Sequence, residues 1–222
     1  MLQIGAIIAD RYEVIDTVGS GGMSVVYKAL DHRLNRNVAI KVLKEEFSND
    51  KTFVSKFRVE AQSAAGLSHP NIVNVFDVGD VGDIHYIVME LVEGITLKEY
   101  IQRKGHLSVS ETVNFTLQIA SGIEVAHDNH IIHRDIKPQN IIIGPDDSVS
   151  LIDFDIARVY RSGRDTDTVF FGTLAYAPPE QYGFAQTDAR TDIYSLGILL
   201  RWLLTGSTKE NKNIRLYRPL EK

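Results

Sequence analysis

HRDIKPQN, residues 133–140, gathers three kinds of functional group on one short stretch of chain. The carboxylate of Asp135 can accept a proton from an attacking hydroxyl, and the ammonium of Lys137 can neutralise the charge of a phosphate. The amide oxygen of Asn140 can hold a divalent cation. Asp153, thirteen residues after Asn140, offers a second oxygen ligand for that cation. Together these groups predict a site for phosphoryl transfer.

A polar loop between a helix and a strand is the alternative interpretation of this stretch. The order and spacing of its residues count against that alternative, because a partner segment, LIDFD at residues 151–155, follows downstream.

The composition is that of a globular chain without disulfide or thiolate-metal chemistry. Of the 222 residues, 44% are hydrophobic and 24% charged, enough for a sizeable core in one large domain or two small lobes. The net charge of −5 argues against a nucleic-acid surface, which is usually basic. Cysteine is absent, and the histidines lack metal-ligand spacing. Residues 1–8 are too short for a membrane span and no other run is long and uncharged enough, so we expect a cytoplasmic chain.

The first part of the chain predicts an antiparallel sheet. β-branched runs begin near Tyr12 and Val25, and GSGGMS at residues 19–24 joins them. A glycine turn between two strands is a hairpin, unlike the strand-to-helix turns of dinucleotide-binding and Walker loops. Its glycines let backbone N–H groups approach phosphate oxygens without an intervening side chain. Tight hairpins also use glycine freely, so the loop alone is weak evidence.

A lysine in the middle of the third predicted strand needs a partner. Lys41 lies in the β-branched run of residues 37–42, where burial without a partner would be costly. Apolar residues then recur at helical spacing from residue 53 to residue 64. Glu60 lies beside that apolar stripe and can pair with Lys41. The alternatives are a lysine on the solvent face of an edge strand and a solvated helix glutamate.

Two further strands, at residues 72–78 and 84–89, complete a predicted five-stranded antiparallel sheet with one helix. The pattern turns helical after Gly94. We therefore predict a first lobe of residues 1–92 and a second, mainly helical lobe of residues 93–222.

Helix starts in the second lobe carry a recognisable signature. Thr96 and Ser108 are each followed three residues later by glutamate, which predicts two capping boxes. The second box should open a helix of about twenty residues. Its buried face is marked by Phe115, Ile119, Ile123 and Ala126. Short strands are expected around residues 141–143 and 149–152.

The segment from about residue 189 to residue 204 predicts a core helix. Apolar residues recur there at helical spacing, namely Ile193, Leu196, Leu200 and Leu203. Other apolar residues make the segment apolar nearly all round. Asp192, near its start, should be a buried acid that needs hydrogen-bond donors. Backbone amides of the 133–140 loop are the candidates.

In order and spacing, these motifs resemble the eukaryotic-like Ser/Thr protein kinases of bacteria, from Tyr12 to about Gly206. The resemblance implies an α+β, two-lobed protein-kinase-like fold that transfers phosphate from ATP to Ser/Thr hydroxyls of proteins. Asp135, Lys137 and Asn140 are then the catalytic residues. Asn140 and Asp153 are the ligands of Mg²⁺, with Mn²⁺ as an alternative.

The resemblance also implies an ATP pocket. GSGGMS looks like the family's glycine-rich loop with Ser24 in place of the third glycine, and Met89 looks like the gatekeeper residue before the hinge. Backbone groups of Glu90 and Val92 would bind adenine between apolar walls. The predicted ATP-binding residues are Val18, Gly19, Ser20, Gly21, Gly22, Met23, Ser24, Val26, Ala39, Lys41, Glu60, Met89, Glu90, Val92 and Ile142.

Residues 160–171 lack periodicity and contain Thr166 and Thr168, which we predict to be regulatory phosphosites. Arg134 is similar to the arginine that makes phosphorylation of this segment matter in the family. Autophosphorylation would involve self-association of the chain. Lys137 together with Thr173 looks like the Ser/Thr-specific arrangement.

Three departures from the family's pattern leave a second function open. Asp155 stands where the family has the glycine of D-F-G, PPE at residues 178–180 replaces A-P-E, and residues 209–222 do not look like the family's further helices. The second lobe therefore looks incomplete. The alternative function is a nucleotide-binding pseudokinase, or a weakly active scaffold. A small-molecule kinase is disfavoured by Arg134 and Lys137.

Overall fold

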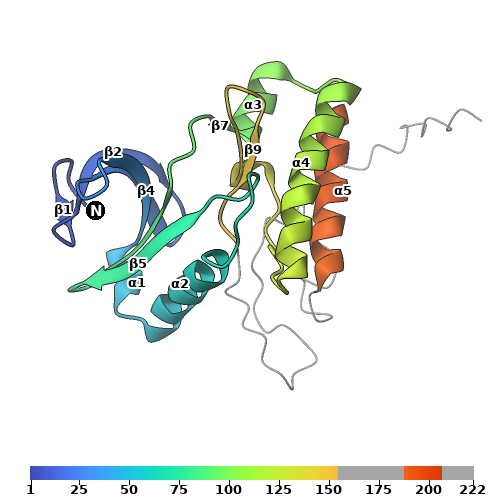
Figure 1. The fold of residues 1–222 in the computed structure, drawn as a ribbon. Coiled ribbons are helices and arrows are strands. Elements are labelled where there is room, and N and C mark those ends of the chain that lie inside the picture. Colours follow the sequence, from blue (N-terminus) through green and yellow to red (C-terminus); the bar gives the residue numbers. More distant parts are fainter. Residues whose placement is uncertain (155–187, 207–222) are drawn as a thin grey trace, which may run out of the picture.

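The computed structural model describes residues 1–154 and 188–206. The expectations for Asp155, Thr166, Thr168, Thr173 and Glu180 lie outside these residues. The described chain forms two lobes, a curled antiparallel sheet with helices below it and a second lobe with two long helices side by side (Figure 1).

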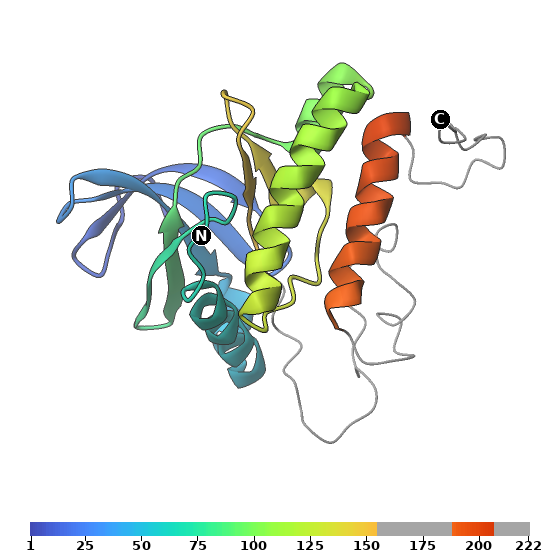
Figure 2. The same ribbon diagram turned by 45° about the vertical axis from the view of Figure 1, so that its right-hand side comes forward.

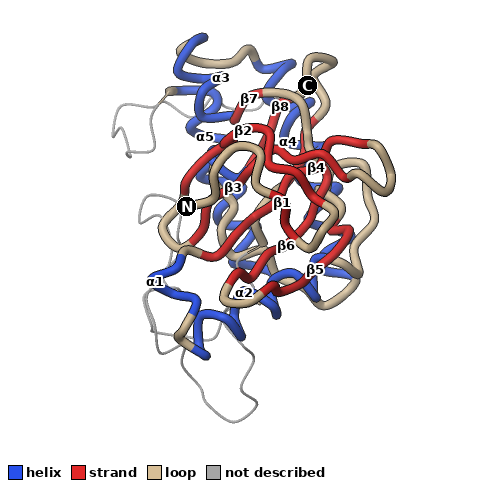
Figure 3. The backbone as a smooth tube through the Cα atoms, turned by 90° about the vertical axis from the view of Figure 1, so that its left-hand side faces the viewer, coloured by secondary structure: helices blue, strands red, loops and turns tan. Residues whose placement is uncertain are grey.

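The first lobe is a six-stranded sheet in the order β1-β2-β3-β4-β6-β5, with every neighbouring pair antiparallel. Figure 3 views it from the side on which β1 lies. The strands are β1 (Ile7–Ile8), β2 (Tyr12–Ser20), β3 (Ser24–Asp31), β4 (Arg36–Leu43), β5 (Val75–Val81) and β6 (Ile84–Glu90).

The prediction of five strands was wrong by one, and one predicted strand begins late. Ile8 pairs with Tyr12 across a turn in which Ala9 and Asp10 have positive φ, so a short extra strand folds back onto β2. The segment expected to begin a strand at residue 72 instead ties the two lobes together. There the N–H of Val73 donates to the carbonyl of Leu151 at 3.0 Å, and β5 starts only at residue 75.

Two helices accompany the sheet where one was predicted. The short α1 (Glu45–Ser48) precedes α2 (Lys51–Ala64), whose first turn is capped by the Asp50 side chain accepting from the N–H of Thr52. Phe57 and Ala61 of α2 pack on Leu43 and Ile87 of the sheet. This packing fixes the helix face that carries Glu60 against the strand that carries Lys41.

The second lobe begins with a small sheet, β7 (Ile95–Thr96), β8 (Ile141–Ile143) and β9 (Val149–Leu151), which lies beside the helices. Its helices are α3 (Leu97–Lys104), α4 (Val109–Asp128), a 3-10 turn at Pro138–Asn140 and α5 (Ala189–Thr205). Both predicted capping boxes are present, at Thr96 with Glu99 and at Ser108 with Glu111. In Figure 2, α4 and α5 run alongside each other, and they are in contact.

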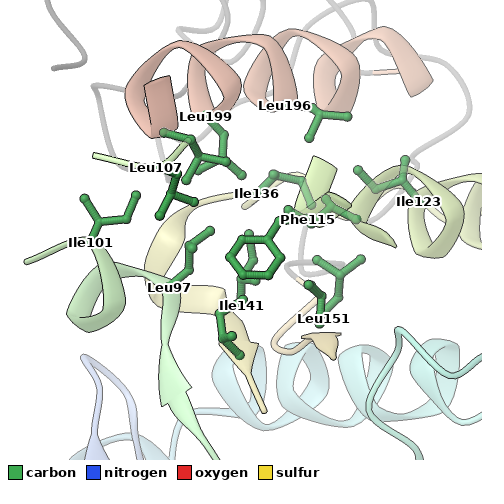
Figure 4. Packing of buried hydrophobic residues seen from close by; sticks show 14 residues of the cluster. Leu97, Ile101, Leu107, Phe115, Ile123, Ile136, Ile141, Leu151, Leu196 and Leu199 are labelled. Carbon is green, nitrogen blue, oxygen red and sulfur yellow. The ribbon is translucent and has the colours of Figure 1, made fainter. Parts of the chain in front are cut away.

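The core of the second lobe is built between α4, α5 and the small sheet (Figure 4). Phe115, Ile119 and Ile123 of α4 are each at most 1% exposed, as predicted. Ile136 from the HRDIKPQN stretch inserts into the same core. One apolar side chain therefore anchors the loop between Asp135 and Lys137, which are both partly exposed.

The buried face of α5 agrees with the prediction at Asp192, Leu196 and Leu203 and differs from it at Ile193. Asp192, Leu199 and Leu203 are fully buried, whereas Ile193 is 57% exposed. Leu196 and Leu203, predicted from their spacing, belong to the core shared with α4, whereas Ile193 lies outside that core. Because the helix is apolar nearly all round, the pattern alone did not identify the face that packs.

The chain crosses from the first sheet to the second between Glu90 and Ile95, and the predicted boundary after residue 92 lies in this connection. Gly94 has a φ of +153°, and a Cβ there would lie 2.2 Å from the carbonyl oxygen of Ile143. Only glycine lets the connection approach β8 so closely. No helix within the described ranges is long and apolar enough to cross a bilayer.

Candidate active site

The 133–140 loop holds its polar groups in a fixed arrangement around Asp135. Lys137 Nζ lies 2.6 Å from Asp135 Oδ2, and Asn140 Nδ2 donates to the same oxygen at 2.8 Å. Asn140 Nδ2 also donates to the backbone carbonyl of Asp135. In the described part of the chain both side-chain contacts fall on Oδ2, which leaves Oδ1 to accept a hydrogen bond from another molecule.

Asp192 secures the backbone of this loop, as the sequence predicts. Its carboxylate is fully buried and accepts from the N–H of His133 at 2.9 Å and from that of Arg134 at 2.7 Å. Arg134 has a φ of 64°, a conformation that bulky residues rarely adopt. The two hydrogen bonds offset the energetic cost of this conformation and fix the backbone from which the Asp135 side chain extends.

The predicted contact between Lys41 and Glu60 is present, and Lys41 has a second carboxylate partner. Lys41 Nζ lies 2.7 Å from Glu60 Oε1 and 2.8 Å from Asp153 Oδ1. The lysine side chain is 6% exposed, whereas that of Asp153 is 36% exposed. Lys41 therefore joins α2 to the segment after β9, and Asp153 remains reachable from solvent.

The charges in this cluster support one another. Burial lowers the pKa of Lys41, but the carboxylates of Asp153 and Glu60 outweigh burial and raise it above the ordinary lysine value. Burial raises the pKa of Asp153, but the charge of Lys41 outweighs it, so that pKa is lowered. His133 and Lys137 act on Asp153 in the same direction as Lys41. Both members of the Lys41–Asp153 pair are thus charged at neutral pH.

Strand register brings several predicted pocket residues to one face of the sheet. Val26 and Ile87 are the cross-strand partners of Lys41, and Ala39 is the partner of Met89. Directly paired residues share a face, so these side chains lie on the face of Lys41. Behind Met89 a cavity of about 30 Å³ reaches Glu60 and Asp153, room for a water molecule or two.

The glycine loop joins β2 to β3 and remains open. A Cβ added at Gly19 or Gly22 would meet no atom within 4 Å, and neither glycine has a positive φ. The backbone conformation and the neighbouring chain therefore do not require glycine at these positions. Close approach of another molecule to the loop backbone is the remaining physical reason for them.

The remaining predicted pocket residues surround the connection between the lobes. The N–H of Glu90 donates to the carbonyl of Asn74 at 2.9 Å, which removes this N–H from ligand binding. Val18 is 59% exposed at the end of β2. Val92 and Ile142 are partly buried, the latter in β8.

Two oxygen donors in the site fit a divalent cation that is also bound by phosphate. Asn140 uses its amide nitrogen as a donor, so its amide oxygen is available as a ligand. The carbonyl of Asn140 accepts from the N–H of Ile152, which holds Asn140 beside the residue that precedes Asp153. Among residues 1–154 and 188–206, no group of three or more His, Cys, Asp or Glu side chains forms a metal site. A two-ligand site suits Mg²⁺, which usually keeps waters and substrate phosphates as its other ligands.

Three contributions to the site were not predicted from the sequence. His127 Nε2 lies 2.8 Å from Asp192 Oδ2. The ring of Phe154, 3% exposed, packs on that of His133 with centroids 4.4 Å apart. Lys44 contacts the glycine loop. Each joins segments far apart in the chain, and no local pattern marks such a contact.

Comparison with known proteins gives the class to which this fold and site belong. Residues 12–216 match the protein kinase domain family, and the chain belongs to that family. Within it, the chain is a eukaryotic-like Ser/Thr kinase catalytic domain of the bacterial type. Membership of the family implies the use of ATP and a divalent metal in general.

The relatives are bacterial proteins that are longer than this chain. It is 48% identical over 204 residues to the serine/threonine-protein kinase PrkC of Bacillus subtilis, covering 91% of this chain and 32% of PrkC. A probable serine/threonine-protein kinase of Clostridium perfringens is also 48% identical over 204 residues, with coverage of 91% and 30%. PknB of Mycobacterium tuberculosis is 41% identical over 206 residues, with coverage of 90% and 33%. The chain thus spans about a third of the length of these relatives.

A solved structure supports the same fold. The crystal structure of the Mycobacterium tuberculosis PknI kinase domain, in a cysteine-to-alanine mutant, superposes with a TM-score of 0.76 at 26% identity. The match covers 97% of this chain and 81% of the PknI chain. The two-lobed protein-kinase fold is therefore confirmed.

Proposed function

We propose that this chain transfers the γ-phosphoryl group of ATP to Ser and Thr hydroxyls of proteins, with Mg²⁺ as the metal. The observation that carries the proposal is the arrangement of Asp135, whose Oδ2 is held by Lys137 and Asn140. The cluster of Lys41, Glu60 and Asp153 adds the groups that a triphosphate needs.

Asp135 would act as the base. Its free oxygen, Oδ1, accepts a hydrogen bond from the substrate hydroxyl and orients the oxygen for in-line attack on the γ-phosphorus. As the new P–O bond forms, the bond to the β-phosphate oxygen breaks, and the hydroxyl proton passes to Asp135. Lys137 stays bound to Oδ2 and lies near the transferred group, where its charge offsets negative charge that develops there.

Lys41 and the metal ligands would hold the nucleotide. Glu60 keeps the ammonium of Lys41 in place at 2.7 Å, and that ammonium can bind the α- and β-phosphates. Asn140 and Asp153 would hold Mg²⁺, which when bound offsets charge on the phosphate oxygens. The adenine would lie between Val18, Val26, Ala39 and Ile142, with the backbone of Glu90 and Val92 at its edge.

The relatives are named as serine/threonine-protein kinases, and no comparison favours a nucleotide-binding module without turnover. Protein substrates, self-association for autophosphorylation on Thr166 and Thr168, and a cytoplasmic location are further parts of the proposal. Mn²⁺ would be a substitute metal at the same ligands.

The test is phosphotransfer from γ-labelled ATP to the chain itself and to a generic basic protein. Asp135→Asn is the matched control, because the carboxamide keeps the shape of the side chain and removes the base. We expect transfer by the parent and a loss of about 10²-fold or more in the variant. Transfer to neither acceptor, with ATP bound normally, would support the pseudokinase alternative.

A further inference from the structure

Lys44 contacts three consecutive carbonyl groups of the glycine loop. Its Nζ donates to the carbonyl oxygen of Gly21 at 2.7 Å and to that of Gly22 at 2.9 Å. Its backbone N–H donates to the carbonyl oxygen of Met23 at 2.9 Å. One residue that follows directly on β4 thus binds the whole tip of the turn between β2 and β3.

These contacts orient the amide groups of the tip. In a trans peptide unit the C=O and the N–H of the next residue point in opposite directions. When the carbonyls of Gly21, Gly22 and Met23 point to Lys44, the N–H groups of Gly22, Met23 and Ser24 therefore point away from it. Within the described residues, the N–H groups of Gly22 and Met23 have no hydrogen-bond partner.

Lys44 contacts the loop from the face of the sheet opposite to Lys41. Along β4, Lys41 faces Glu60 of α2, whereas Ile40 and Val42 pack in the core on the other face of the sheet. Lys44 is extended, with φ −67° and ψ 146°, and continues the alternation onto the face of Ile40 and Val42. The carbonyls of Gly21 and Gly22 are bound by the Lys44 ammonium, so the N–H groups of Gly22 and Met23 point away from it, towards the face that carries Lys41.

The contact with Lys44 can lower the entropy that the glycine turn loses when it binds a ligand. Gly19 to Gly22 are exposed, and a glycine-containing segment loses much conformational freedom when it is ordered around a ligand. Successive N–H groups that converge on one side form a concave anion site. A lysine that fixes the carbonyls in advance reduces the entropy lost on binding a phosphate.

We propose that Lys44 is a positioning residue, which presets the N–H groups of Gly22 and Met23 to receive the β- and γ-phosphates of the nucleotide. The inference rests on the proposed nucleotide site but not on phosphoryl transfer. Lys44 should therefore increase the affinity for ADP and ATP but not for adenosine, because adenosine has no phosphate to reach the tip of the loop.

The experiment measures nucleotide affinity by calorimetry for the parent, Lys44→Met, Lys44→Arg and the control Lys51→Met. Lys51 is exposed in the same lobe, and in the described structure it forms no contact with the loop. Lys51→Met therefore removes the same charge as Lys44→Met without removing a contact with the loop. The ligands are adenosine, ADP and Mg²⁺-ATP, and the melting temperature without nucleotide is measured in parallel.

For Lys44→Met we expect the Kd for ADP and ATP to rise about tenfold, the scale of one charge-assisted hydrogen bond. The Kd for adenosine should stay at the parental value, Lys44→Arg should recover most of the loss, and Lys51→Met should match the parent. In turnover assays the KM for ATP should rise more than kcat falls. Equal ATP affinity in Lys44→Met and the parent, or an equal loss for adenosine and ATP, would overturn the inference.

The outcomes separate this inference from the proposed function. A parent that binds ADP and ATP without transferring phosphate refutes the proposed transfer and leaves the Lys44 comparison intact. A parent that binds no nucleotide refutes both. Normal transfer with no effect of Lys44→Met on affinity refutes the inference alone.

Discussion

Asp192 Oδ1 accepts a hydrogen bond of 2.7 Å from the backbone N–H of Arg134. The contact joins α5 to the HRDIKPQN loop, and the residue it holds has a φ of 64°. Arg134 is also the residue immediately before Asp135. A fully buried carboxylate on a core helix thus supports the strained backbone that aims the proposed base.

Asp192→Asn should disturb both stability and turnover. The carboxamide keeps the volume but has one acceptor oxygen for three donors, so one or two buried groups lose their partners. We expect the free energy of unfolding to fall by about 1–3 kcal/mol. The value of kcat should fall while ATP affinity changes little, as measured by denaturation, kinetics and calorimetry.

Asp128→Asn makes the same chemical change at an exposed position of α4. It should leave both quantities at the parental values. If Asp192→Asn also kept the parental free energy of unfolding and kcat, the loop would not depend on this carboxylate.

Lys41→Met should strongly reduce transfer while the fold remains. The substitution removes the ammonium that binds both Glu60 and Asp153, and kcat/KM should fall by roughly 10²–10³-fold. Glu60→Gln keeps Lys41 and should cost about tenfold, because the amide oxygen still accepts a weaker hydrogen bond. Circular dichroism and steady-state kinetics provide the measurements.

Because Lys41 and Glu60 act as a pair, their effects should not add in the double variant. Glu46→Gln, at an exposed position of α1, is the control and should behave as the parent. A kcat/KM for Lys41→Met close to that of the parent would remove the lysine from the proposed site.

Acid should weaken the first lobe through Asp31. The hydrogen bonds from the Arg11 side chain, at 2.8 and 2.7 Å, together with backbone N–H groups of Arg33 and Leu34, lower the pKa of Asp31 to about 2. A lowered folded-state pKa contributes stability that is fully present above the unfolded value of about 3.9 and is lost as pH falls towards 2. The melting temperature should therefore decline between about pH 5 and pH 2.

Asp31→Asn cannot titrate and should show a smaller decline over the same range, from a lower starting temperature. Thermal melts at several pH values and constant ionic strength give the comparison. Parallel curves for the two proteins would show that other carboxylates cause the acid sensitivity.

Gly94→Ala should destabilise the protein. A methyl group at this position would lie 2.2 Å from the carbonyl oxygen of Ile143, and the φ of +153° is unfavourable for alanine. The connection between the lobes would have to shift, at a cost of about 1–3 kcal/mol. Chemical denaturation measures the loss.

Gly197→Ala is the contrasting change, because it lies inside α5 and a Cβ there meets no atom within 4 Å. It should raise stability by up to about 1 kcal/mol through helix propensity. Equal effects of the two substitutions would contradict the close approach at Gly94.

Phosphorylation of Thr166 and Thr168 should switch the enzyme on. A phosphate adds nearly two negative charges and three acceptor oxygens, and Arg134 is the bidentate donor we expect to pair with it. Incubation with ATP and Mg²⁺ followed by peptide mass spectrometry should find phosphate on one or both. The Thr166→Ala/Thr168→Ala double variant should be slower on an added substrate, and a double variant as fast as the parent would exclude the switch.

Much of the candidate site could be predicted from the sequence because the patterns that mark it involve residues close together in the chain. The spacing of Asp135, Lys137 and Asn140 on one loop and the capping glutamates at three-residue distance need only neighbouring residues. Asp192 was predicted to accept from the loop because a buried acid must find donors, and the contact is present. Lys41 in an apolar strand likewise predicted an acidic partner, and Glu60 contacts it.

The sequence by itself determined the long elements, their order, and the chemistry carried by each loop, but not the short β1 and α1. Only the tertiary structure decided which face of each element is buried and which distant groups meet. Ile193 faces outward because α4 packs on another side of an almost uniformly apolar helix. Asp153 meets Lys41 across 112 residues, and Lys44 reaches the tip of the glycine loop from the end of β4. Such contacts depend on how whole elements dock, and docking is set by packing between surfaces that no local pattern specifies.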